Sequence, residues 1–391
     1  MASTTRYTIA VLGCLGLIAC AKGNLNEEGR DLGLTTDALS SEKVATDTKF
    51  RLYAEIASPV SGGRTLQAND LHRDGSRIYV AYNYAGEVQA GAIQVIDTSN
   101  PAKPVLVSEV VLADTDINGV YVYGTQLFAV GATSANGGSA ILVRFDLDSG
   151  KIKAETKTSR VLGSYAGTDV IVTDSTIYAL SGNTGGVETF SRSTLAPMNS
   201  TSVADARALS FSKTESELFV LSGNASGSLI KLSPNGATLA TYATGGGTTP
   251  ESKATIESGK TSVLTSLGES GFKILCQGSG TVLGSIPAVT LNGLLASQTV
   301  TNAVTANSKY VFTSNGEAGV YVYEIKKGGV ANGSCRQAAL TKLGALNFGS
   351  RISTNFVLSD SKTLVVAAGL GGVKVINLSY FDQDDDFGDF D

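Results

Sequence analysis

The chain has 391 residues, of which 45 are Gly and 7 are Pro; 42% are hydrophobic, 17% are charged, and the net charge is −5. This length exceeds that of one ordinary hydrophobic core, so the chain holds two domains or one repeat-built ring or solenoid. The hydrophobic content excludes a wholly disordered chain, and the single histidine, His72, excludes a metal centre built on several histidines.

The first residues have the pattern of an export signal. Residues 1–6 are weakly basic, and residues 7–17 are mostly apolar but too few to span a bilayer. We therefore expect residues 1–19 to be a signal peptide. The stretch Leu17-Ile18-Ala19-Cys20 resembles the lipobox of bacterial lipoproteins.

That resemblance implies that cleavage makes Cys20 the new N-terminus and that fatty acyl chains such as palmitate anchor it to a membrane. Ala21 follows the cysteine, which by the same resemblance favours the bacterial outer membrane. Cys14 is a rival site, but it leaves too few apolar residues before the cysteine. A plain secretory signal with an incidental cysteine is the remaining alternative.

Two polar segments flank the main body of the chain. Residues 20–48 lack a periodic apolar pattern and are expected to form the lipidated Cys and a flexible tether. Residues 382–391 contain six Asp. They are expected to be a solvated acidic tail; a calcium loop is the alternative, although the EF-hand spacing is not met. The body, residues 49–381, is near neutral, so no nucleic-acid partner is expected.

One turn followed by a β-rich run recurs along the body. Its copies are marked by their third residues: Ser76, Thr125, Ser175, Ser216, Gly259, Ser308 and Ser361. The first and last marks are six repeats apart, which gives 47.5 residues per repeat. Strand-type alternation of Val, Ile, Tyr, Phe and Thr accompanies each copy. Such a repeat matches a four-stranded propeller blade.

The repeats predict an all-β fold, a seven-bladed β-propeller of four-stranded antiparallel blades over residues 49–381. The last repeat ends at Ser379 without an outer strand, whereas residues 49–56 form a strand with no blade of its own. Because an open sheet edge exposes unpaired backbone groups, we expect this N-terminal strand to complete blade seven. A solenoid is the structural alternative.

Residues 93–105, Ile93-Gln94-Val95-Ile96-Asp97 and the segment after it, resemble the LVIVD repeat of exported bacterial β-propellers, and residues 373–379 resemble it in part. This resemblance implies the fold and not an activity. Residues 145–151 are similar to a turn of quinoprotein-like repeats, but the chain has no Trp, so no quinone cofactor is expected.

Cys276 and Cys335 are the other two cysteines of the chain. Cys276 ends the third strand of the predicted blade five, and Cys335 lies in the loop after the third strand of blade six, so both should emerge on one face of adjacent blades. Export to an oxidising compartment permits a disulfide between them, and two buried free thiols are the alternative.

Polar residues recur where the inner strands are expected to begin. They are Asp70, Asp116, Asp169, Asn302 and Asn355. One hypothesis is a polar ring at a mouth of the channel that binds a divalent cation or a polar ligand. The other, which we favour, is that these side chains accept backbone N–H groups at the strand starts.

No cofactor, metal site or catalytic residue is assigned from the sequence. His72 lacks a fixed partner for acid–base catalysis, and no nucleophile elbow or phosphate-binding loop occurs. We expect a monomeric, non-enzymatic outer-membrane lipoprotein whose loops bind a protein or glycan. A lactonase-like or lyase-like enzyme with a metal or polar site in the channel is the alternative.

Overall fold

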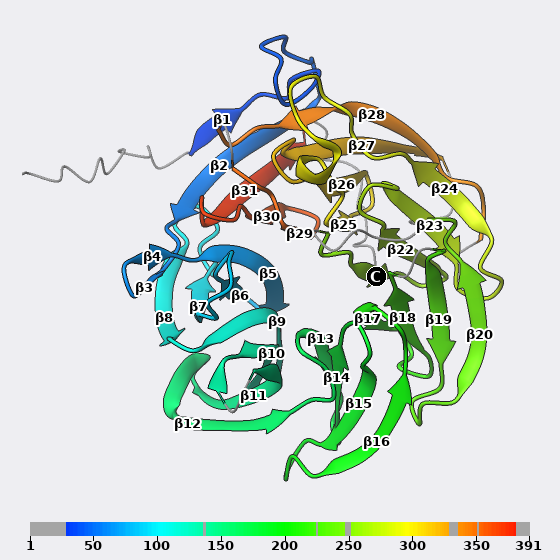
Figure 1. Ribbon diagram of the computed structural model, residues 1–391. Helices are drawn as coiled ribbons and strands as arrows, with labels where there is room; N and C mark the ends of the chain where they lie inside the picture. The colour runs from blue at the N-terminus through cyan, green and yellow to red at the C-terminus, as the bar shows by residue number, and fades with distance from the viewer. Residues whose placement is uncertain are drawn as a thin grey trace, which may run out of the picture.

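The computed structural model describes residues 29–135, 138–223, 226–246, 252–327, 335–349 and 352–380. These residues form seven antiparallel sheets arranged as blades around a central channel (Figure 1). The predicted seven-bladed β-propeller is confirmed. The described residues include no helix long and apolar enough to cross a membrane.

Blades one to six each contain four strands that follow in chain order from the channel outward (Figure 1). Blades one and two comprise β5 (Gln67–Asp74), β6 (Arg77–Asn83), β7 (Gly91–Asp97) and β8 (Val105–Leu112), then β9 (Thr115–Tyr123), β10 (Gln126–Thr133), β11 (Ser139–Asp148) and β12 (Lys151–Val161). Blades three and four comprise β13 (Gly167–Val172), β14 (Thr176–Ser181), β15 (Gly186–Ser191) and β16 (Pro197–Ser202), then β17 (Ala206–Phe211), β18 (Leu218–Ser222), β19 (Ser228–Leu232) and β20 (Thr238–Ala243). Blades five and six comprise β21 (Ile256–Ser258), β22 (Ser262–Ser266), β23 (Phe272–Cys276) and β24 (Val282–Ile286), then β25 (Ala303–Ala306), β26 (Tyr310–Ser314), β27 (Val320–Lys327) and β28 (Ala339–Leu346).

Two small elements lie outside the blades. The hairpin of β3 (Val60–Ser61) and β4 (Arg64–Thr65) precedes blade one, and the short 3-10 helix η2 (Ala296–Gln298) precedes blade six.

Blade seven is assembled from both ends of the described chain. Its inner strands are β29 (Phe356–Ser359), β30 (Thr363–Ala367) and β31 (Val373–Tyr380), and β2 (Thr48–Ile56) pairs with β31. The register places Phe50 opposite Leu378 and Leu52 opposite Ile376. Phe50 and Leu52 are both buried in the core shared with blade six. The predicted closure of the ring by the N-terminal strand is confirmed.

The close approach of β2 to β31 requires a glycine at position 372, directly before β31. Gly372 has φ of +71°, and a Cβ added there would collide with the Ile56 carbonyl oxygen at the end of β2. Only glycine adopts this backbone conformation without strain while the closing strand approaches so closely.

The expectation of a flexible tether is wrong for residues 30–48. The short strand β1 (Arg30–Leu32) pairs with β2 and gives blade seven a fifth strand. Leu34 is only 1% exposed, and Thr35 exchanges two backbone hydrogen bonds with Ala345 of β28. Two buried apolar residues, Leu34 and Ala38, and backbone pairing hold this segment, and neither produces a periodic sequence pattern. Residues 20–28, with the lipidation site, and the tail at 382–391 lie outside the described residues.

Cys276 and Cys335 form a disulfide, with their Cα atoms 5.3 Å apart. Cys276 ends β23 in blade five, and Cys335 lies on the approach to β28 in blade six. The bridge therefore joins two neighbouring blades near their outer strands, 59 residues apart in the sequence.

Removal of this disulfide should destabilise the propeller. In the chain-entropy model, opening a loop of 59 residues costs about 4 kcal/mol of unfolding free energy. We expect the Cys276→Ser/Cys335→Ser variant to lose stability of this order in urea unfolding, and reductant to lower the stability of the wild type but not of the variant. Alkylation of both thiols in native, unreduced protein would contradict the bridge.

Candidate functional site

A belt of hydrogen bonds surrounds the mouth of the channel. In six of the seven blades, a side chain at the start of the inner strand donates to a backbone carbonyl of the next blade. The bonds run from Asn69 to Ile117, Asn118 to Gly167, Thr168 to Ala206, Arg207 to Ser252, Asn302 to Thr354 and Asn355 to Ala68, with lengths of 2.9–3.1 Å. Each acceptor directly precedes the equivalent position of the following blade, so the belt runs around the ring.

Bulges in the inner strands direct these side chains. The pairing of β5 with β6 shifts register between Ala68 and Asp70, which leaves Asn69 outside the ladder. The same shift occurs around Thr168 in β13 and around Arg207 in β17. A bulge adds one residue that is free of ladder pairing and re-aims its side chain, here toward the adjacent blade.

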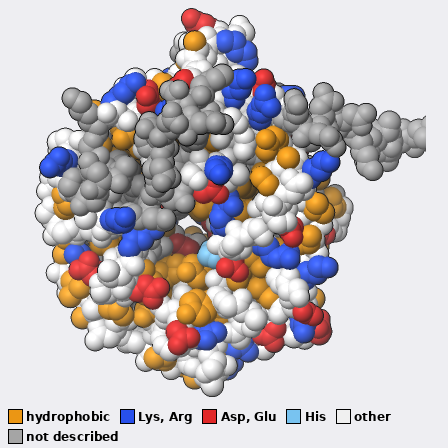
Figure 2. Space-filling view, turned by 180° about the vertical axis from the view of Figure 1, so that it is seen from behind, with side chains coloured by type: hydrophobic (Ala, Val, Ile, Leu, Met, Phe, Trp, Pro, Cys, Tyr) orange, Lys and Arg blue, Asp and Glu red, His pale blue; other side chains and the backbone are white. Residues whose placement is uncertain are grey.

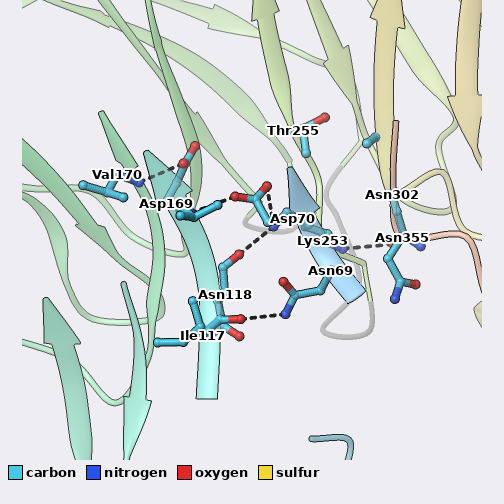
Figure 3. A network of polar contacts seen from close by, with 12 residues as sticks. Asn69, Asp70, Ile117, Asn118, Asp169, Val170, Lys253, Thr255, Asn302 and Asn355 are labelled. Atoms are coloured by element: carbon cyan, nitrogen blue, oxygen red, sulfur yellow. Dashed lines mark hydrogen bonds and ion pairs between the residues drawn. The ribbon is translucent and has the colours of Figure 1, made fainter. Parts of the chain in front are cut away.

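Lys253 is the exception to this pattern. It occupies the belt position of blade five, but its side chain crosses the channel (Figure 3). Its Nζ lies 3.1 Å from Oδ1 of Asp70 and donates to the Asn118 carbonyl oxygen at 2.7 Å. Its own backbone N–H donates to Oδ1 of Asn302 at 3.1 Å. One ammonium thus connects blade five with blades one and two across the opening.

Two cavities adjoin Lys253. One, of about 310 Å³, opens at the mouth and is lined mainly by amide side chains: Gln67, Asn69, Asn83, Asn118, Asn302 and Asn355. The other, of about 190 Å³, is lined by Asp70, Asp169, His72 and apolar side chains of the inner strands. Lys253 lines both. On the opposite face of the ring, hydrophobic side chains gather beside the central opening (Figure 2).

The structure places four of the five predicted ring residues around the channel. Asn302 and Asn355 occupy the belt position, whereas Asp70 and Asp169 stand one residue further along their strands. In the sequence, all four lie at the same distance before the turn that marks their repeat. The bulges account for the difference: they lengthen the inner strands of blades one and three, while the pairing of β25 with β26 has no register shift.

Asp116 is not a member of this ring. Its Oδ1 accepts the backbone N–H groups of Tyr84 and Ala90, both at 3.0 Å, and so fixes the loop between β6 and β7. Asn118 takes the belt position of blade two. Three residues at the belt position were not predicted from the sequence: Asn118, Arg207 and Lys253. The displaced offset of Asp116 is a signal that another residue fills the position in blade two.

The two channel carboxylates have all their oxygens engaged. Asp70 accepts the Val120 N–H through Oδ2 at 2.9 Å, while Oδ1 faces Lys253. Asp169 accepts the N–H groups of Leu209 and Val170, at 2.9 and 2.8 Å. Within the described ranges, no three His, Cys, Asp or Glu side chains are grouped so that they could hold a metal ion.

Burial controls the protonation of these groups. It raises the pKa of Asp70, although the Lys253 ammonium acts in the opposite direction. Burial, with the nearby charge of Asp70, raises the pKa of Asp169 to about 7. Glu257, which accepts the Ala306 N–H of the next blade, has its pKa raised to about 7 by burial.

His72 lies deeper in the channel, on the wall of the smaller cavity. Its ring centroid is 4.2 Å from that of Tyr121, and burial lowers its pKa to about 4. The imidazole is therefore neutral at pH 7, and the contact with Tyr121 is a packing contact between two rings.

The chain is similar in fold to many solved structures, among them the following two. The computationally designed Ika8 protein matches with a TM-score of 0.52 and 12% identity over 90% of this chain and 100% of its own. The WD40 β-propeller domain of Doa1 matches with a TM-score of 0.55 and 11% identity over 84% of this chain and 97% of its own. No protein-family model and no curated protein matches the sequence. At these identities the likeness shows the fold alone.

The titration of Asp169 predicts a pH-dependent stability. Between pH about 4 and 7 the folded protein retains a proton that the unfolded chain releases, so rising pH lowers the unfolding free energy. The lowered pKa of His72 has the opposite effect below pH about 6.5, because there the unfolded chain binds a proton that the folded protein does not. The effect of Asp169 is therefore isolated by comparing a variant of Asp169 with the wild type. The stability of Asp169→Asn relative to wild type should rise from pH 4 to 8, by up to about 4 kcal/mol, in urea unfolding.

Asp174→Asn provides the control, because the Asp174 side chain is 91% exposed. Its stability difference from the wild type should change with pH far less than that of Asp169→Asn, because the substitution removes only an exposed contact with Arg192. A difference for Asp169→Asn that does not change with pH would contradict the assignment.

Proposed function

We propose that this chain is a non-enzymatic binding propeller, anchored as a monomer to the bacterial outer membrane through acylated Cys20. The lipobox-like Leu17-Ile18-Ala19-Cys20 and the resemblance of residues 93–105 to the LVIVD repeat of exported propellers support the location. The disulfide is in keeping with an oxidising compartment.

The observation that carries the binding role is the exposed apolar side chains on the mouth face. The connections that precede each inner strand and those between second and third strands emerge at this face. They expose Tyr165, Leu295 and Leu370 at 66%, 70% and 55%. The belt holds the blades beneath these loops in fixed positions, and loops on a rigid frame are the usual site of recognition.

The channel carboxylates support binding over catalysis. Both oxygens of Asp70 and of Asp169 are held by the protein, whereas a general base must reach a substrate proton. The amide groups of the belt likewise hold neighbouring blades. The partner that fits this face is a protein or a glycan of the cell envelope.

The anchor is tested by two single substitutions in the full-length chain. Cys20→Ser removes the acylated sulfur, so we expect the protein to move from the membrane fraction to the soluble fraction, because acyl chains supply the membrane affinity. Cys14→Ser is the matched control and should remain in membranes and incorporate labelled palmitate. Membrane retention of Cys20→Ser would overturn the anchor.

The binding face is tested by placing a charge on it. Full-length protein immobilised in detergent should retain an envelope component, and Leu295→Asp and Leu370→Asp should lose it, because a charge in an apolar contact must be desolvated. Leu239→Asp is the control, since Leu239 is 53% exposed on the outer strand β20. Equal retention, or equal loss, by all three variants would contradict a binding site on the mouth face.

A further inference from the structure

The geometry of the larger cavity points to a ligand class, and we propose that it binds a neutral carbohydrate. This inference rests on the binding function proposed above and narrows it to one site. The cavity of about 310 Å³ at the channel mouth falls in the size range of ligand pockets. Amide side chains dominate its wall, and Lys253 closes its inner end.

The cations on the wall are already neutralised. Lys253 pairs with Asp70 at 3.1 Å. Arg207 donates two hydrogen bonds to the Asp205 carboxylate, of 2.6 and 3.0 Å, and a third to the Ser252 carbonyl oxygen. An anionic ligand would have to compete with these carboxylates. The charge balance therefore favours a polar ligand without net charge.

Polar groups on the wall lack protein partners. Asn69 is 8% exposed and Ser252 is 3% exposed, yet Asn69 Oδ1 and Ser252 Oγ form no hydrogen bond in the described structure. Leaving a buried polar group unsatisfied costs about 1–3 kcal/mol. Both oxygens lie just beneath the cavity surface, with less than 1 Å² exposed, so the groups that a ligand meets first are the side chains that face the cavity.

Gln67 adds a further free group at the same wall. Its side-chain amide has no hydrogen bond among the described residues and carries both donors and an acceptor. A sugar hydroxyl, which donates and accepts at one atom, matches this mixture. A peptide that binds as an added strand needs a free strand edge, whereas the inner-strand starts here are engaged by the belt.

Tyr165 supplies an apolar surface at the rim. It lies in the connection between β12 and β13, lines the cavity and is 66% exposed. Its ring combines an apolar face with a polar tip. The apolar face of a sugar ring can cover this exposed surface while the sugar hydroxyls reach the Gln67 amide.

The test is calorimetric titration of the full-length protein in detergent. The neutral probes are maltotriose, cellotriose and diacetylchitobiose, and digalacturonic acid is the anionic probe. We expect saturable binding of at least one neutral probe and none of the anionic probe. Gln67→Ala and Tyr165→Ala should each weaken binding by about tenfold or more, equivalent to 1.4 kcal/mol.

Two variants control for nonspecific effects. Tyr165→Phe keeps the ring and should retain most of the affinity. Gln337→Ala removes an exposed amide that binds the Val282 carbonyl away from the mouth, and it should bind as the wild type does. A circular dichroism spectrum and urea midpoint matching the wild type exclude unfolding of any variant.

Failure of every neutral probe to bind, or binding that survives both Gln67→Ala and Tyr165→Ala, would overturn this inference. Preferential binding of digalacturonic acid would also overturn it. If an envelope component is still captured through Leu295 and Leu370, the binding function stands and only the carbohydrate site is wrong. If capture fails as well, the proposed function falls with it.

Discussion

The structure depends on a constraint that acts between blades rather than within them. Each blade is a separate sheet, and only one chain connection joins it to the next. Side chains at the inner-strand starts add a second tie, since each reaches the carbonyl just before the equivalent residue of its neighbour. Because these ties lie closest to the axis, they set the width of the opening. The wall of the mouth cavity is therefore built from the same side chains that tie the blades together, and ties of this kind preorganise a binding site.

The single departure from this repetition is informative. Lys253 occupies a belt position but spans the channel to Asp70 and Asn118. An amide at this position could hold only the adjacent blade, whereas a long cationic side chain crosses to the far side and neutralises a buried carboxylate. Six of the seven belt positions thus hold neighbouring blades together. The seventh, Lys253, lies between the amide-lined cavity and the cavity lined by acidic and apolar groups.

Much of the fold could be predicted from the sequence, because a turn, a β-rich run and a constant repeat length are local features. The closing strand was also predictable, since the last repeat lacks an outer strand. The belt was not, because counting from the turn ignores the bulge at Asn69, and a bulge is decided by pairing with β6. For the same reason Asp116 was placed in the ring although its carboxylate fixes a loop. The packed segment around Leu34 was missed because two isolated buried residues, Leu34 and Ala38, give no period.

Closure of the ring by the N-terminal strand also sets the order of events during biosynthesis. Phe50 of β2 pairs with Leu378 of β31, more than 320 residues later, so β2 must wait for the last of the described strands. At about 5–20 residues per second, this delay is tens of seconds. During that time β2, with its buried Phe50 and Leu52, has no sheet to join. β2 therefore lacks its main partner until β31 has been made, and closure of the ring is the latest strand pairing of the described fold.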